Sequence, residues 1–176
     1  MSKLQSYAEK DSRYEQLRLL SRQYNQYINM RVKCKLVLLN LLEQTASSKI
    51  PTLSPQDPST KMLILEAIRM YREINTSTDM ILSQMKNIAK TLVEYDILIS
   101  MKGIGEKLAP RLIAEVGDIR RFHSAGVLIA YAGIDAPAYQ PGQFCSSNRR
   151  ISKRGSKPLR KIGYEIMASF TRQKTD

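Results

Sequence analysis

Two glycines, separated by one residue and flanked by lysines, interrupt an apolar stretch at 98–113. The turn contains Lys102, Gly103, Gly105 and Lys107, and apolar runs precede and follow it. Glycine lets a turn approach a phosphate closely, and the first N–H groups of a following helix favour an anion. The lysines add attraction without reading base sequence. We expect this turn to contact nucleic-acid phosphates; the alternative is a tight helix–helix turn that only requires glycine.

A second group of basic residues lies between residues 148 and 161, where seven Lys or Arg and no Asp or Glu occur. Such side chains release counterions when they bind phosphates, and Ser152 and Ser156 can donate hydrogen bonds to phosphate oxygens. We expect nucleic-acid binding by Arg149, Arg150, Lys153, Arg154, Lys157 and Arg160. The alternative is a solvated basic loop.

The remaining polar residues do not suggest a hydrolytic or metal site. His123 is the single histidine and is expected at the surface or at a helix start, whereas Asp118 and Asp135 are expected to cap helices or bond backbone. Acidic residues do not cluster as two-metal nucleases require. Cys34 and Cys145 have no evident base partner and make no metal quartet. We therefore predict that this chain itself binds no metal and no cofactor.

The charge of the chain favours a polyanionic partner. Its 176 residues include 28 Lys or Arg and 16 Asp or Glu, a net charge of +12, and residues 101–176 alone contribute +8 (14 basic, 6 acidic). The 43% hydrophobic content is that of a core-forming protein, and no apolar run approaches a membrane span or a signal peptide. These features predict a cytoplasmic protein without a membrane partner.

Two long helices are expected before the basic third of the chain. Apolar residues recur at three- and four-residue steps over 4–46 and again over 60–99, and a Pro- and Ser-rich loop lies near 47–60. The second seam comprises Ile64, Ala67, Tyr71, Ile74, Thr78, Ile81, Met85, Ile88, Leu92 and Tyr95. The pattern predicts an antiparallel helical hairpin, a coiled-coil arm that mediates a homodimer. A monomeric hairpin that packs on the rest of the chain is the alternative.

The elements are expected to shorten after residue 98, where glycine and proline become frequent. Ser124 and Ser156 are suitable N-caps, and Gly133 is a suitable C-cap. Helices are expected near 106–116, 124–132 and 157–171. The fold class is therefore mainly α: a long helical hairpin over 1–97, followed by a small basic helical domain over 98–176.

Four blocks in this second part support a resemblance to a known family. They are Leu98–Ile113, Ala114–Phe122, Leu128–Asp135 and Ile151–Arg160. Their order resembles the C-terminal, serine-bearing domain of insertion-sequence transposases with a RuvC-like N-terminal domain, an architecture shared by pilin-gene invertases. The first block also resembles a helix-hairpin-helix motif, and the hairpin is similar to the coiled coil between the family's two catalytic domains.

The resemblance implies DNA strand exchange by a C-terminal serine together with metal-binding acidic residues of the RuvC-like domain, acting across a dimer. Some members use a structured guide RNA. No counterpart of the RuvC-like domain is present here, so a divalent metal is implied only for that missing part. Counting back from the Ile-Ser-Lys-Arg-Gly block places Pro141 at the serine position, and proline has no hydroxyl. Nothing suggests that Ser146 or Ser147 replaces the serine.

We therefore predict the DNA-binding portion of a transposase or site-specific recombinase, inactive in strand cleavage by itself. DNA is the expected partner, and structured guide RNA is a further candidate. Because family members continue beyond the position of Asp176, a truncated chain is expected. The alternatives are a dimeric architectural or regulatory nucleic-acid-binding module, and a helical protein whose basic loop contacts an acidic protein.

Overall fold

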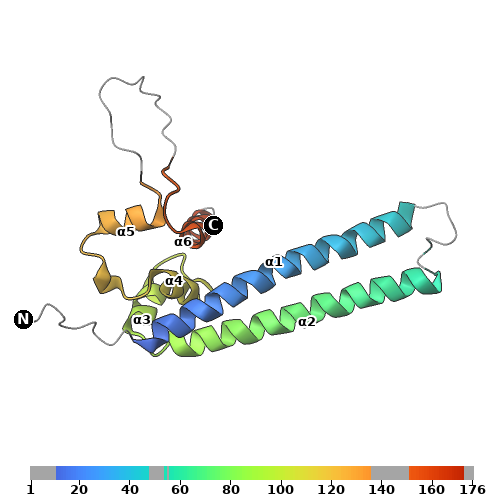
Figure 1. The fold of residues 1–176 in the computed structure, drawn as a ribbon, viewed down its shortest axis with the longest axis horizontal. Coiled ribbons are helices and arrows are strands. Elements are labelled where there is room, and N and C mark those ends of the chain that lie inside the picture. The colour runs from blue at the N-terminus through green and yellow to red at the C-terminus, as the bar shows by residue number, and fades with distance from the viewer. Residues whose placement is uncertain (1–10, 48–53, 55, 136–150, 173–176) are drawn as a thin grey trace, which may run out of the picture. The chain divides into compact units, whose positions relative to one another are not determined.

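The computed structural model describes residues 11–47, 54, 56–135 and 151–172, and this part of the chain is helical (Figure 1). Its elements are α1 (Ser12–Ser47), α2 (Pro58–Ala89), α3 (Val93–Ser100), α4 (Leu108–Val116), the short 3-10 helix η2 (Ile119–Arg121), α5 (Ala125–Ala132) and α6 (Lys157–Arg172). No strand occurs in these ranges, so the mainly-α prediction is confirmed. None of the described helices is long and apolar enough to span a membrane.

The chain forms two compact units. The hairpin unit is Leu20–Gln84, and the basic unit combines Met1–Leu19 with Met85–Asp176. Most of α1 and most of α2 therefore belong to the hairpin unit. The start of α1, the end of α2 and all later helices belong to the basic unit.

Small and apolar residues at heptad spacing form the buried side of α2 in the hairpin unit. Ala67, Ile74 and Thr78 are buried, as predicted, and Leu82 is more buried than the predicted Ile81. The Thr78 hydroxyl donates a 2.7 Å hydrogen bond to the Ile74 carbonyl, which satisfies this polar group inside the seam.

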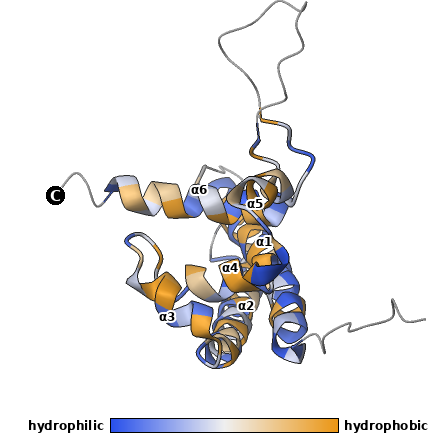
Figure 2. Ribbon diagram, turned by 90° about the vertical axis from the view of Figure 1, so that its left-hand side faces the viewer, coloured by the Kyte–Doolittle hydropathy of each residue, from blue (hydrophilic) through white to orange (hydrophobic). Residues whose placement is uncertain are grey.

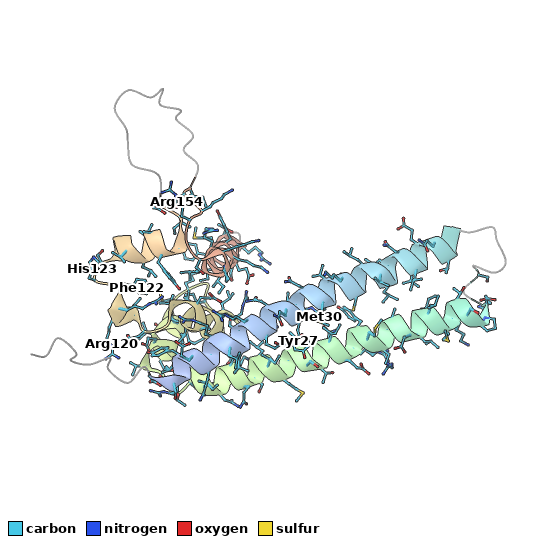
Figure 3. All side chains as sticks on the ribbon, viewed as in Figure 1. Tyr27, Met30, Arg120, Phe122, His123 and Arg154 are labelled. Carbon is cyan, nitrogen blue, oxygen red and sulfur yellow. The ribbon has the colours of Figure 1, made fainter. Side chains whose placement is uncertain are left out.

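The C-terminal half of α1 differs from this pattern, because apolar residues that recur there at three- and four-residue steps are exposed. Val32, Leu36, Leu39 and Leu42 keep 44–54% of their surface in solvent. Tyr27 and Met30 lie on the same helix (Figure 3), and Met30 is 47% exposed. The hairpin unit thus presents an apolar surface on α1.

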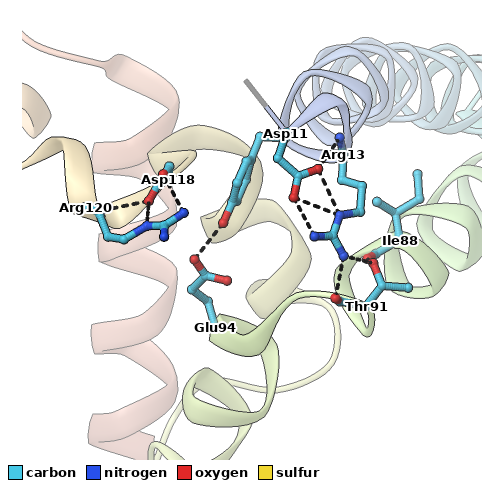
Figure 4. A network of polar contacts seen from close by, with 8 residues as sticks. Asp11, Arg13, Ile88, Thr91, Glu94, Asp118 and Arg120 are labelled. Atoms are coloured by element: carbon cyan, nitrogen blue, oxygen red, sulfur yellow. Dashed lines mark hydrogen bonds and ion pairs between the residues drawn. The ribbon is translucent and has the colours of Figure 1, made fainter. Parts of the chain in front are cut away.

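The single helix predicted over 60–99 is wrong, because α2 ends at Ala89 and α3 begins at Val93. The Thr91 hydroxyl donates to the carbonyl of Ile88 at 2.7 Å. The Arg13 guanidinium, 78 positions away, donates to the Thr91 carbonyl at 2.6 Å (Figure 4). Carbonyls at a helix end need such partners, so this distant arginine stabilises the break.

The basic unit has a small core of helix faces. Ile113 and Ala114 of α4 are buried, as are Leu159 and Ile162 of α6. Hydrophobic and hydrophilic residues alternate along α6 (Figure 2), as an amphipathic helix requires. Arg111 joins the same two helices through a bidentate ion pair to Glu165, with N–O distances of 2.5 and 3.2 Å.

Candidate nucleic-acid interface

The Gly-Ile-Gly turn between α3 and α4 has a buried side and an exposed side. Gly103 has φ +88°, and a Cβ there would lie 3.4 Å from the Ile166 carbonyl oxygen and from the Phe170 Cβ of α6. Ile104 is buried beside it. Gly105 is exposed, and a Cβ there would meet nothing within 4 Å. Gly103 therefore meets the positive φ of a buried part of the turn, whereas Gly105 presents open backbone.

The exposed side of this turn leads directly into α4. Lys107 is the N-cap residue and makes no side-chain cap bond. The first two N–H groups of α4, those of Leu108 and Ala109, donate instead to the Gly105 carbonyl at 2.9 and 3.0 Å. Glu106 accepts a 2.8 Å hydrogen bond from the Lys86 ammonium, which lowers the pKa of this carboxyl. Lys102 is exposed, with its ammonium 5.9 Å from the centroid of the Phe170 ring.

At the N-terminal end of α6, residues 153–156 cross residues 131–133 backbone to backbone. This crossing fixes the basic loop that precedes the helix. Lys153 donates its N–H to the Gly133 carbonyl at 3.0 Å, and Ser156 donates to the Tyr131 carbonyl at 2.7 Å. A Cβ on Gly133 would lie 2.4 Å from the Gly155 nitrogen, and one on Gly155 would lie 2.1 Å from the Tyr131 carbonyl oxygen. Only glycine fits at both positions.

Several predicted phosphate ligands are used within this crossing. The Arg160 guanidinium donates to the carbonyls of Ala132 and Gly155, both at 2.9 Å. The Ser152 hydroxyl donates to the Asp135 carboxylate at 2.6 Å, and the Ser152 N–H donates to the Asp135 carbonyl at 2.9 Å. Asp135 is therefore bound through both its side chain and its backbone. These groups position the loop.

Local caps that the sequence predicts are confirmed around α5 and α6. The Ser124 hydroxyl accepts from the N–H of Val127, and the Ser156 hydroxyl accepts from the N–H of Leu159. Gly133 closes α5 in the left-handed conformation, with φ 67° and ψ 33°. These caps fix where the basic loop meets α6.

Of the predicted side chains in the crossing and at the start of α6, Lys153, Arg154 and Lys157 remain for a ligand, and all three are exposed. In the described part of the chain none of the three forms an ion pair, and Figure 3 shows Arg154 directed outward from the fold. Lys153 has φ +57°, an uncommon conformation for a lysine, which the crossing imposes. The predicted residues outside the described ranges are Pro141, Cys145, Ser146, Ser147, Arg149 and Arg150.

The two predicted contact regions lie at opposite ends of α6. The Gly103 turn packs against Ile166 and Phe170, whereas Lys153 and Arg154 precede the first helical residue, Lys157. At 1.5 Å of rise per residue, the helix separates these points by about 14–20 Å. The structure does not merge them into one cluster.

A third basic segment, Ile119–His123, was not among the residues predicted from the sequence. Asp118 caps it, accepting from the Arg120 N–H at 2.9 Å and from the Arg120 guanidinium at 3.0 Å, and these bonds lower the pKa of Asp118. The Arg121 guanidinium lies over two aromatic rings. His123 is exposed at the end of the segment (Figure 3). The sequence Arg-Arg-Phe-His was the available signal.

An open groove of about 660 Å³ runs between α3, α4, α5 and α6. Among the described residues that line it, Glu94 and Arg160 are the charged ones, and Arg160 is bound to backbone carbonyls. Glu94 accepts a 2.7 Å bond from the Tyr14 hydroxyl (Figure 4); burial first, and then this bond, raise the pKa of Tyr14. Within the described ranges no three His, Cys, Asp or Glu side chains group as metal ligands. The groove therefore offers little for acid–base chemistry.

Comparison with known proteins adds one finding. Residues 95–176 match the sequence model of the Transposase IS116/IS110/IS902 family. The match covers most of the basic unit and supports a resemblance to insertion-sequence transposases, and with it a role in transposition. No curated protein matches the chain.

Proposed function

We propose that this chain is the DNA-binding portion of a transposase, and that it contacts the sugar–phosphate backbone through its basic unit. The observation that carries the proposal is the Gly133–Gly155 crossing, which projects Lys153 and Arg154 from a fixed stem. A fixed stem lowers the entropy lost when cationic side chains meet phosphates. The family match over 95–176 supports the assignment.

A second contact is proposed at the turn between α3 and α4. Gly105 exposes backbone there, and the adjacent carboxylate of Glu106 is paired with Lys86. Lys102 and Lys107 are exposed beside it. The 14–20 Å between this turn and the basic loop corresponds to about four to six base pairs of B-DNA, at 3.4 Å per pair. One duplex could therefore be contacted at two backbone segments.

The proposal assigns no strand cleavage to this chain by itself. Its basis is the count back from the Ile-Ser-Lys-Arg-Gly block, which places Pro141 at the family's serine position. If a partner chain supplies a RuvC-like domain, replacing Pro141→Ser should restore cleavage of a DNA substrate. If the complete complex with Pro141→Ser still does not cleave DNA, this placement of the serine is wrong.

We further propose that the hairpin unit mediates a homodimer. Structured guide RNA is a further candidate ligand of the basic unit. The supporting observation for the dimer is the exposed apolar surface of α1, including Val32, Leu36 and Leu39. This surface equally suits a dimeric architectural module, the alternative to a transposase fragment. Light scattering should give twice the chain mass, and the change Leu36→Glu with Leu39→Glu should return it to one chain. A monomeric unsubstituted protein would contradict the dimer.

The test of DNA binding is fluorescence anisotropy of a labelled duplex at about 50 and 200 mM salt. The double change Lys153→Gln with Arg154→Gln should lower the slope of log affinity against log salt by roughly two. The matched control, Lys33→Gln with Lys35→Gln, removes the same charge from two exposed positions of α1.

The control should leave the slope much closer to that of the unsubstituted chain. Equal losses for both pairs would show that net charge alone, and not the fixed loop, drives binding. A chain that does not bind duplex even at the lower salt concentration would contradict the proposed function.

A further inference from the structure

The Arg121 side chain is held against two aromatic rings of the basic unit. Its guanidinium carbon lies 4.5 Å from the centroid of the Phe122 ring and 4.6 Å from that of Tyr131. The two ring centroids are 5.3 Å apart. Rings on opposite faces of the cation would have centroids about 9 Å apart, the sum of the two distances, so the two rings do not sandwich the guanidinium.

The Arg121 side chain is also accessible to a ligand. Arg121 is exposed, and no described carboxylate forms an ion pair with it. Its neighbour Arg120 differs, because Asp118 binds that guanidinium at 3.0 and 3.1 Å. No acidic residue occurs between Asp118 and Asp135 in the sequence.

A planar cation that already rests on aromatic rings is suited to stacking. Arg guanidinium planes and aromatic rings are the surfaces on which unpaired nucleobases stack. Phe122 and Tyr131 already contact the guanidinium, so little side-chain entropy is lost when a base covers it. A paired base inside a duplex is already stacked on its neighbours and cannot use this surface.

We propose that Arg121, backed by Phe122 and Tyr131, is a stacking site for an unpaired nucleobase of single-stranded DNA or RNA. The site deepens the proposed function and rests on it for the class of ligand. It uses a different surface from Lys153 and Arg154, because it depends on base faces whereas they depend on phosphates.

The experiment uses the full chain and single-stranded oligonucleotides, about twelve nucleotides long, that carry 2-aminopurine, whose fluorescence falls when the base stacks. Parallel DNA and RNA oligonucleotides separate the two sources of the base. Matched oligonucleotides with abasic positions keep the phosphates and remove the base. The variant Arg121→Lys keeps the charge and removes the plane, and Arg120→Lys is the control because that guanidinium is bound by Asp118.

The unsubstituted chain should quench 2-aminopurine and bind the intact oligonucleotide about fivefold or more tightly than the abasic one. Arg121→Lys should abolish both effects, whereas Arg120→Lys should preserve both. Phe122→Leu should weaken both, and thermal unfolding shows whether that variant stays folded. Equal binding of intact and abasic strands by the unsubstituted chain, or full discrimination by Arg121→Lys, would overturn the site.

The stacking site and the proposed phosphate contacts can fail independently of each other. If Lys153→Gln with Arg154→Gln leaves duplex binding unchanged while Arg121 still governs quenching, the phosphate surface fails and the stacking site stands. The reverse pattern removes the stacking site alone.

Discussion

Two pairs of glycines lie at opposite ends of α6, and they differ in how strongly the structure constrains them. At the crossing before α6, Gly133 and Gly155 meet backbone to backbone, and either added Cβ would lie within 2.4 Å of a main-chain atom. At the turn packed on the far part of α6, Gly103 has only ordinary contacts at 3.4 Å, and Gly105 has open space. The closely spaced pair is therefore the less constrained one.

This difference separates two reasons for glycine near a nucleic-acid surface. The crossing needs glycine to bring two chain segments together and so fixes the basic loop by internal hydrogen bonds. The turn needs Gly103 for its positive φ, whereas Gly105 is compatible with a side chain unless a ligand approaches it closely. A stability measurement can separate the two roles without any ligand.

The largest effect is expected for Gly155→Ala. The new Cβ would meet the Tyr131 carbonyl oxygen at 2.1 Å, so the backbone of the crossing must move. We expect the free energy of unfolding, measured in urea, to fall by about 3 kcal/mol. Gly163→Ala is the matched control: it lies within α6 with nothing within 4 Å of the added Cβ, and should gain about 0.5–1 kcal/mol. Equal stabilities would show that the crossing is not rigid.

A smaller loss is expected for Arg160→Met, which removes the side chain that joins the two sides of the crossing. The carbonyls of Ala132 and Gly155 would lose their donor, so the free energy of unfolding should fall by about 2 kcal/mol. Lys161→Met removes the same charge from the adjacent exposed position and should change stability by less than about 0.5 kcal/mol. Duplex affinity sharpens the test, because Arg160→Met should weaken binding more than Lys161→Met if the loop must be fixed.

The turn should respond less, and its two glycines should differ. Gly103→Ala forces a side chain into φ +88° and close to α6, with an expected cost of about 1–2 kcal/mol. Gly105→Ala should be neutral or slightly stabilising in the free chain. If Gly105 contacts a phosphate, the same change should weaken duplex binding, which anisotropy would detect. A large stability loss for Gly105→Ala would contradict the open geometry.

The parts of the fold that were predictable from sequence are those set by local signals. Hydroxyl caps at Ser124 and Ser156 and the left-handed C-cap at Gly133 depend on residues within one helical turn, and all three are confirmed. The heptad seam likewise gave Ala67 and Ile74 as buried residues of α2.

The parts that were missed depend on contacts between distant positions. The break after Ala89 is stabilised by Arg13, and periodicity carries no information about that contact. Arg160 was assigned to phosphates with its neighbours, because charge in a sequence does not show which guanidinium will reach two carbonyls 5 and 28 positions away. The stacking of Arg121 likewise depends on Tyr131, ten positions further along the chain.

The smallest expected effect concerns Glu106, the acidic residue of the open turn. Its pKa is lowered by the Lys86 ammonium, so the carboxylate stays charged until the pH falls below the ordinary range of a glutamate. The stability that this pair adds is present above that ordinary pKa and is lost as the pH falls through the lower, folded pKa. Since Glu106 is 63% exposed, the effect on folding should be close to the limit of detection.

Binding should report this residue more clearly than stability does. Glu106→Gln removes a negative charge beside the N-terminus of α4 and releases Lys86, so the salt slope for duplex binding should steepen by roughly one if the turn contacts phosphate. Glu66→Gln, which alters an exposed ion pair of α2, is the control and should leave the slope unchanged. An unchanged slope for Glu106→Gln would assign all phosphate contact to the opposite end of α6, where the glycines are fully constrained.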